Sequence, residues 1–235
     1  MIEISIARLS VMLVPLLLIG WLAHRWAKLG TEVAWASLRM ISQLLAVGYV
    51  LVALFALQNP WAALGVLAFM ITMSSIIAVR TVKTHKWIAW RDALLSIAIG
   101  GGSVLVVVVL GVLDLKPWYQ LDKMIPLAGM IFSNAMTAIT LGADRWQAER
   151  SAGHGIEEAR GTAWRASLIP QMNAFMAVGL VALPGMMTGQ ILAGVSPLMA
   201  VRYQILVMSM VLSSAGFSVA IFLARTIARE RNAKP

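Results

Sequence analysis

Cysteine is absent from this chain of 235 residues, and ionisable side chains are scarce. Without cysteine there can be no disulfide, no thiolate metal site and no cysteine nucleophile. Only ten residues are Asp or Glu, and only three are His. The sequence contains neither an HExxH zinc motif nor a GxSxG nucleophile elbow. An enzyme is therefore poorly supported, because acid–base and nucleophilic catalysis need such groups.

Apolar residues, by contrast, are abundant. They make up 60% of the chain, and the mean hydropathy is +0.83. A soluble domain of this length does not hide so much apolar surface, so we expect a polytopic membrane protein. The apolar runs predict an all-α fold with seven transmembrane helices in a single domain, residues 1–235. The predicted spans are about 4–23, 35–57, 61–79, 93–113, 124–143, 168–195 and 204–223.

Basic residues predict the orientation of these spans. The net charge of +9 would suggest nucleic acid in a soluble protein, but the positive-inside rule explains it better. With the amino terminus outside, 15 of the 19 Lys and Arg residues fall in inward-facing segments. They are Arg25, Lys28, Arg39, Arg80, Lys83, Lys86, Arg91, Arg145, Arg150, Arg160, Arg165, Arg225, Arg229, Arg231 and Lys234. The carboxyl terminus is then cytoplasmic. No nucleic-acid binding is expected, because these residues are scattered over four segments.

The sixth span is predicted to be broken at Pro184-Gly185. No charged residue lies between Leu168 and Pro197, yet Pro184 removes a backbone hydrogen bond and Gly185 adds slack. A broken span is tolerated only where its freed backbone groups face protein or a wet cavity. Interrupted helices often line the substrate path of transporters, although a kink used only for packing is the alternative.

Polar and methionine side chains of the fifth and sixth spans are candidates for lining a substrate pathway. They are Asn134, Thr137, Met172, Asn173, Met176, Met186, Met187, Thr188 and Gln190. Ser133, Thr137 and Thr140 share one helical face, which suits either a pathway or a tight helix interface with cross-helix hydrogen bonds. Methionine is also a common packing residue. No set of metal ligands can be assigned.

Two further patterns bear on mechanism. The run Gly100-Gly101-Gly102-Ser103 is not a Walker A loop, because no Lys follows it, and it predicts close contact between helices instead. All acidic residues lie at or outside the ends of the predicted spans, so we expect no buried carboxylate that relays protons. Energy for any active transport would then come from another subunit.

Four segments resemble the FetB-type permease family. They are RMISQLLAVGYVL at 39–51, IPLAGMIFSNAMTAITLGADR at 125–145, LIPQMN at 168–173 and LPGMMTGQILAGVSPLMAVRYQI at 183–205. Members of this family are membrane subunits of ABC transporters, linked in bacteria to iron export and in plants to aluminium tolerance. The resemblance extends from the second span to the seventh.

The resemblance implies a permease homodimer with two copies of a separate ABC ATPase, in the bacterial cytoplasmic (inner) membrane. This chain would bind membrane lipid but no cofactor, and ATP and Mg would be used by the partner. The expected function is ATP-driven export of a metal ion, foremost iron. Export of a small organic molecule such as a nucleotide sugar, or an ATP-independent seven-helix channel or receptor, remain alternatives.

The same resemblance points to the segment 144–165 as the cytoplasmic element that couples to the ATPase. Glu157, Glu158, Arg160 and Gly161 resemble the Glu-Ala-Ala…Gly pattern of such coupling elements. A plain solvated connector is the alternative, because charged amphipathic stretches usually face water.

Overall fold

The computed structural model describes residues 5–57, 59–82 and 85–232. Lys83, Lys234 and residue 4, where the first predicted span begins, lie outside the described residues. Within the described ranges the chain forms helices and no named strand, which confirms the all-α prediction. It divides into two compact units, residues 1–57 and 58–235. Each unit is described by itself.

The first unit consists of α1 (Ile6–Ser10), α2 (Leu13–Ala27) and α3 (Gly30–Phe55). Helix α2 ends at Ala27, and the next residue, Lys28, adopts a left-handed backbone conformation with φ of 57° that turns the chain towards α3. Neither α2 nor α3 has a buried residue within the unit. Apolar side chains exposed all along two long helices are what a lipid environment favours.

The second unit begins with α4 (Pro60–Ala78), α5 (Lys86–Ser96) and α6 (Gly102–Val106). Two π-helical stretches, η1 (Ile97–Gly101) and η2 (Val107–Val112), join α5 and α6 into one long helical segment. It continues with α7 (Leu121–Ser151), α8 (Ile156–Ala177), α9 (Gly185–Leu192) and α10 (Pro197–Asn232).

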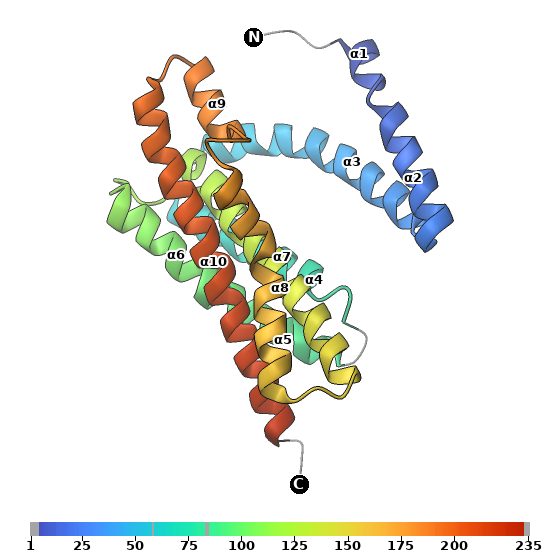
Figure 1. Cartoon of the computed structure of the whole chain (residues 1–235). Helices are drawn as coiled ribbons and strands as arrows, with labels where there is room; N and C mark the ends of the chain where they lie inside the picture. The colour runs from blue at the N-terminus through green and yellow to red at the C-terminus, as the bar shows by residue number, and fades with distance from the viewer. Residues whose placement is uncertain (1–4, 58, 83–84, 233–235) are drawn as a thin grey trace. The chain divides into compact units, whose positions relative to one another are not determined.

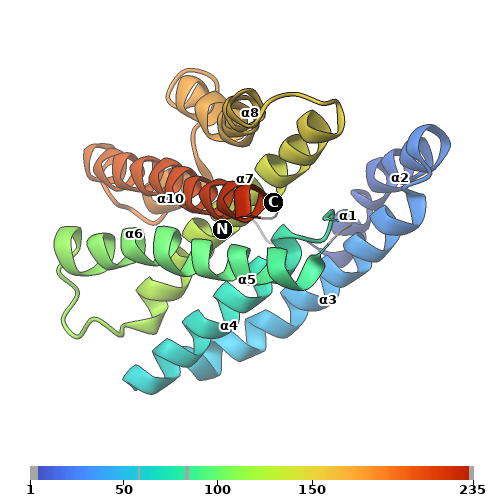
Figure 2. The same cartoon turned by 90° about the horizontal axis from the view of Figure 1, so that it is seen from below.

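Helices α7, α8 and α10 run alongside one another, with α9 at the end of the bundle where α8 stops (Figure 1). Seen from below, the α5–α6 segment lies beside α10 (Figure 2). The core of this bundle is formed by apolar side chains such as Phe132, Ile139 and Val219, which are almost fully buried. Burying large side chains of this kind contributes about 1.5–3 kcal/mol each in water, and dispersion replaces part of that term where lipid is the solvent.

In the described part of the chain, six helices are long and apolar enough to cross a membrane, and the predicted count of seven spans is not confirmed. They comprise α1 and α2 together, α3, α4, the helical segment Lys86–Val112, α7 and α10. The predicted sixth span, 168–195, is divided between the end of α8 and the short α9. The helix is interrupted near Pro184-Gly185 as predicted, but the interruption already begins at Val178.

Several helices extend beyond the predicted spans, because the sequence has no helix-breaking residue at the predicted boundary. Most of the predicted connector 144–165 is helical, because α7 continues to Ser151 and α8 starts at Ile156. Arg202 and Tyr203 were expected between two spans, but they lie inside α10. Pro197 begins that helix, at the position where its missing N–H has no intrahelical partner anyway.

The glycine run makes the close helix contact that its sequence predicts. A Cβ placed on Gly100 would lie 2.6 Å from the backbone nitrogen of Ser218 in α10, which is too close for any side chain. Gly142 of α7 is similarly close to Val219, at 2.7 Å from its Cγ2. Small residues thus bring α10 against both neighbouring helices.

Candidate functional site

An amide pair connects α7 and α8 in the interior of the bundle. The Nδ2 group of Asn134 donates to the carbonyl oxygen of Met130 at 2.8 Å. The Nε2 group of Gln171 donates to the Oδ1 atom of Asn134 at 3.2 Å. Gln171 is only 3% exposed, and its Oε1 atom has no hydrogen-bond partner among the described residues. Asn134 was a predicted pathway residue, whereas Gln171 was missed, although it lies in the LIPQMN segment.

The hydroxyl groups of α7 that share a face have different partners. Thr137 donates to the carbonyl oxygen of Ser133 at 2.9 Å, and Ser133 donates to that of Met130 at 3.2 Å. Thr140 also reaches across to α4, where it donates to the carbonyl oxygen of Ala78 at 3.0 Å. The helix-interface interpretation therefore holds for Thr140. The hydroxyls of Ser133 and Thr137 stay within their own helix.

Three of the predicted pathway residues lie on the exposed side of α8. The side chains of Met172 and Met176, one turn apart, are 42% and 70% exposed. Asn173, beside them, is exposed and makes no hydrogen bond with the described part of the chain. These three residues form an exposed stripe on α8.

The interruption between α8 and α9 has an identifiable cause. Val178 adopts an extended conformation, and Gly179 has a φ of +80°, which favours glycine. Pro184, also extended, precedes the first residue of α9 and its carbonyl accepts from the N–H of Thr188 at 3.0 Å. Of the other predicted pathway residues on α9, Met186 is exposed and Met187, Thr188 and Gln190 are half-buried. The Oε1 atom of Gln190 is buried and has no partner among the described residues.

At the opposite end of the bundle, α10 is held by ion pairs that the sequence did not predict. Asp92 of α5 is 5% exposed and accepts from the Nε group of Arg225 at 2.8 Å. Its second carboxylate oxygen lies 3.0 Å from Arg229. The sequence did not predict the burial of Asp92, although this residue lies just outside the predicted span 93–113, as expected for an acidic residue. Asp92 lies near the end of its helix, and α10 supplies two cations that compensate for its burial.

A second buried carboxylate, Glu149, lies near the end of α7. It pairs with Arg145 and His154, each at 2.5 Å. Arg150, next in sequence, forms an ion pair with Glu230 of α10. These contacts fix the end of α7 against α10. They do not form a proton pathway through the bundle, because both buried acids lie near helix ends.

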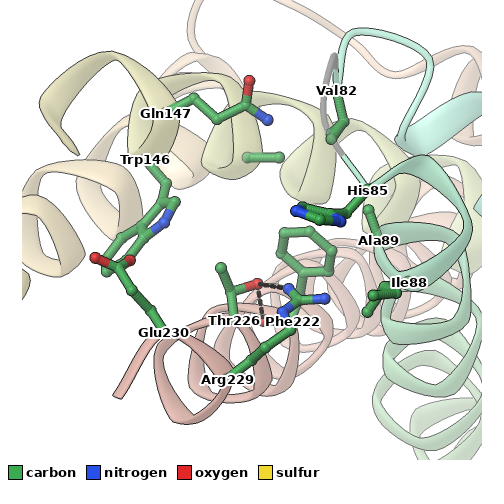
Figure 3. Close-up of a pocket in the computed structure, with 11 residues that line it drawn as sticks. Val82, His85, Ile88, Ala89, Trp146, Gln147, Phe222, Thr226, Arg229 and Glu230 are labelled. Carbon is green, nitrogen blue, oxygen red and sulfur yellow. Dashed lines mark hydrogen bonds between the residues drawn. The ribbon is translucent and has the colours of Figure 1, made fainter. Parts of the chain in front are cut away.

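A cavity of about 400 Å³ opens beside these ion pairs (Figure 3). Trp146 and Gln147 of α7 face His85 and Ala89 across it, and α10 closes it. Arg229 donates to Thr226 at 3.5 Å in its wall. The lining combines apolar side chains with a cation, an anion and a histidine. This mixture does not favour a ligand of either charge sign.

The residues that resemble a coupling pattern lie on the first turns of α8. Glu157 pairs with Arg160 at 2.5 Å and with Arg231 of α10 at 3.2 Å. Glu158 and Gly161 are exposed, and a Cβ on Gly161 would meet nothing within 4 Å. This surface is therefore charged and sterically open.

No cluster of three or more His, Cys, Asp or Glu side chains able to hold a metal ion occurs within residues 5–57, 59–82 and 85–232. The polar groups near the α8–α9 interruption are amides and hydroxyls, accompanied by thioethers.

Comparison with known proteins identifies the relatives of this chain. The model of the uncharacterised protein family UPF0014 matches residues 6–155 and 150–230. A UPF0014 membrane protein of Synechocystis, slr1647, is 37% identical over 85% of this chain and 82% of its own length. The probable iron export permease protein FetB of Escherichia coli is 34% identical over 81% of this chain and 78% of its own.

A plant protein is similar over nearly the same extent. Protein ALUMINUM SENSITIVE 3 of Arabidopsis thaliana is 32% identical over 80% of this chain and 72% of its own length. No solved structure matches the chain. The family match covers both structural units, and the relatives named as membrane proteins agree with the apolar helices. The chain therefore belongs to protein family UPF0014, and it is also similar to the FetB protein of Escherichia coli.

Proposed function

We propose that this chain is the membrane-spanning subunit of an ABC transporter that exports a metal ion, foremost iron, across a bacterial cytoplasmic membrane. The observation that carries the proposal is its similarity, over most of both chains, to the Escherichia coli protein named a probable iron export permease. The plant relative whose name refers to aluminium is a second protein named for a metal. The interrupted helix with its unpaired amides is consistent with a transport path.

The proposed topology has seven crossings, with α8 and α9 together forming one interrupted crossing. The amino terminus would be outside and the carboxyl terminus cytoplasmic. The distribution of Lys and Arg supports this orientation. The α7–α8 connection and the end of α10 lie at the same end of the second unit, as this topology requires (Figure 1).

ATP would be hydrolysed by a partner, because the sequence has no Walker A motif. Two ATPase subunits would dock on two copies of this chain and use ATP and Mg. The charged, open surface around Glu157, Glu158 and Gly161 is the proposed docking point. Conformational changes of the ATPase would then move α8 and, with it, the interruption that begins at Val178.

Two copies of the chain would pair through the exposed side of α8. Asn173 has no hydrogen-bond partner on that side, and Met172 and Met176 flank it. A second copy would shield the amide from lipid and place a matching stripe opposite it. The pathway would then run between the two copies.

The test is ATP-dependent uptake of iron(II) into inverted membrane vesicles that contain this chain and its ATPase. The proposal predicts uptake that requires ATP and disappears when this chain is omitted or the ATPase carries a Walker A Lys→Ala substitution. Aluminium and a nucleotide sugar serve as alternative substrates in the same vesicles.

Three outcomes separate the alternatives. Uptake of a nucleotide sugar without iron would keep the ABC permease and reject the metal. Iron flux without ATP would indicate a channel. Failure of any ATPase to co-purify with the chain would reject the ABC assignment.

A further inference from the structure

A groove lies between the start of α8 and the end of α10, which are neighbours in the bundle (Figure 1). Its volume is about 380 Å³. Its lining residues are Arg160 and Trp164 of α8 and Ala220, Leu223, Ala224, Ile227, Ala228 and Arg231 of α10. Within the described part of the chain, this lining includes two cations and no acidic side chain. The groove is therefore apolar over most of its length and positively charged where the arginines lie.

The apolar part of the groove has a buried floor and an open side. Leu223 and Ile227 are buried in the bundle, whereas Ala224 and Ala228, one turn apart, are exposed. An exposed alanine beside a neighbouring helix leaves room that a longer side chain would fill. A hydrocarbon chain fits such a space, because it gains dispersion contacts there and needs no hydrogen-bond partner.

Both arginines lie at the same end of the groove, because Glu157 pairs with each of them. The Oε2 atom of Glu157 is 2.5 Å from Arg160, and its Oε1 atom is 3.2 Å from Arg231. All three side chains are more than half exposed, so these ion pairs are weak and can exchange partners. One carboxylate does not neutralise two guanidinium groups, and the guanidinium group binds phosphate through paired N–H donors.

The depth of the groove in a membrane follows from the charges of α10. Residues 203–224 contain no charged side chain, and at 1.5 Å per residue they span about 33 Å, close to the thickness of a hydrocarbon core. Ala220 and Ala224 then lie at the edge of that core. Arg231 lies about 10 Å beyond Ala224, from where its long side chain reaches the lipid headgroups. Trp164 has the amphipathic ring that is common at this boundary.

We propose that this groove binds one phospholipid with an anionic headgroup. An acyl chain lies over Leu223 and beside Ala224. The phosphate takes the place of Glu157 on one or both of Arg160 and Arg231, and the excess of positive charge favours an anionic over a zwitterionic headgroup. The bound lipid joins α8 to α10 at the membrane surface. This site belongs to the chain alone and depends neither on the ATPase nor on the transported substrate.

Replacing both arginines tests the headgroup contact. Lipid binding to the purified chain in detergent is measured by native mass spectrometry, with phosphatidylglycerol and phosphatidylcholine as probes. The wild type should bind phosphatidylglycerol severalfold more tightly. Arg160→Gln combined with Arg231→Gln should weaken phosphatidylglycerol binding about tenfold and abolish the preference. Arg80→Gln combined with Arg91→Gln removes the same charge outside the groove and should keep the preference. Equal losses in the two double variants would overturn the site.

Filling the groove tests the acyl-chain contact. Ala224→Leu keeps both arginines but occupies the space, and we expect about fivefold weaker binding of both lipids. Ala46→Leu, at an exposed position of α3, is the control and should bind both lipids as the wild type does. Both alanines are exposed, so neither variant should change the temperature of thermal unfolding. Wild-type lipid binding in Ala224→Leu would overturn the proposal.

Two other occupants of the groove are distinguished by the same variants. If Ala224→Leu separates a dimer of the chain and leaves lipid binding unchanged, the groove receives a second copy and the lipid site is wrong. If added ATPase displaces bound phosphatidylglycerol from the wild type, the ATPase occupies the groove and the lipid site is also wrong. Retention of phosphatidylglycerol in the permease–ATPase complex supports the proposal.

Discussion

Polar side chains have different hydrogen-bond and ion-pair partners at the two ends of α10. Near its carboxyl end, Arg225 and Arg229 pair with Asp92, and Glu230 pairs with Arg150, so the charges of three helices compensate one another. Near its amino end, Gln204 lies beside the interrupted helix with an amide oxygen that has no partner among the described residues. The difference separates two tasks. Ion pairs hold the helices together at the carboxyl end, whereas the amino end packs a neutral amide beside the interrupted helix.

Gly100→Ala, between these two ends, should give the largest effect. The new methyl group would lie 2.6 Å from the backbone nitrogen of Ser218, and no side-chain rotation can relieve a clash with backbone. We expect a loss of about 3 kcal/mol in the free energy of unfolding, at the upper end for overpacking. Thermal unfolding in detergent measures it. Gly102→Ala in the same run is the control, because its Cβ would meet nothing within 4 Å. Equal stability of both variants would contradict the contact.

Asp92→Asn tests the paired end directly. The substitution leaves two partly buried arginines without their anion, and we expect a loss of about 2 kcal/mol, reduced by the partial exposure of both arginines. Asp114→Asn is the control, because the ion pair of Asp114 with Lys116 is largely exposed. A lower unfolding temperature is expected for Asp92→Asn alone. If both variants unfold at the wild-type temperature, the ion pairs do not stabilise this end.

Charge reversal at Glu157 and Glu158 tests whether the paired end also receives the ATPase. Since Glu157 is mostly exposed, little stability should be lost. We expect ATP-driven uptake to fall about tenfold in the doubly substituted Glu157→Lys, Glu158→Lys chain, the equivalent of about 1.4 kcal/mol at a docking surface. Co-purification of the ATPase is measured in parallel. Asp122→Lys, at the start of α7, should leave both quantities unchanged. Normal docking of the double variant would place the ATPase elsewhere.

Asn173→Ala should have the smallest effect and concerns the unpaired end. Loss of one amide from the exposed side of α8 is expected to lower the uptake rate about threefold, the equivalent of a weak polar contact. Ser42→Ala is the control, because the Ser42 hydroxyl only donates to the carbonyl oxygen of Leu38 in its own helix. An uptake rate unchanged in Asn173→Ala would remove this residue from the pathway.

Much of the fold could be predicted from sequence because it follows from composition and local chain stiffness. Long apolar runs define membrane helices, and Pro184 followed by Gly185 weakens a helix, so the interruption was expected. Its beginning at Val178 was not, since the left-handed conformation of Gly179 shows no signal in an apolar run. The contact at Gly100 could be predicted as close packing, but its partner Ser218 could not.

The site was harder to predict, because burial and pairing depend on which helices meet. In the sequence, Asp92 is an acidic residue close to a predicted loop. Its burial between two arginines results from the packing of α10 against α5. Gln171 and Gln204 are ordinary polar residues in sequence. Their importance comes from an unpaired oxygen in a packed interior, and single-sequence patterns carry no information on that.

The most direct test of the difference between the two ends of the bundle compares two variants, Gln190→Leu at the interrupted helix and Asp92→Asn at the ion pairs. The measurement is the rate of ATP-driven iron uptake into inverted vesicles, divided by the amount of folded permease. We predict that Gln190→Leu lowers this rate, because it removes an unpaired amide oxygen beside the interruption. Asp92→Asn should leave the rate per folded molecule near the wild-type value. The opposite pattern, with a normal rate in Gln190→Leu and a lost rate in folded Asp92→Asn, would contradict the account.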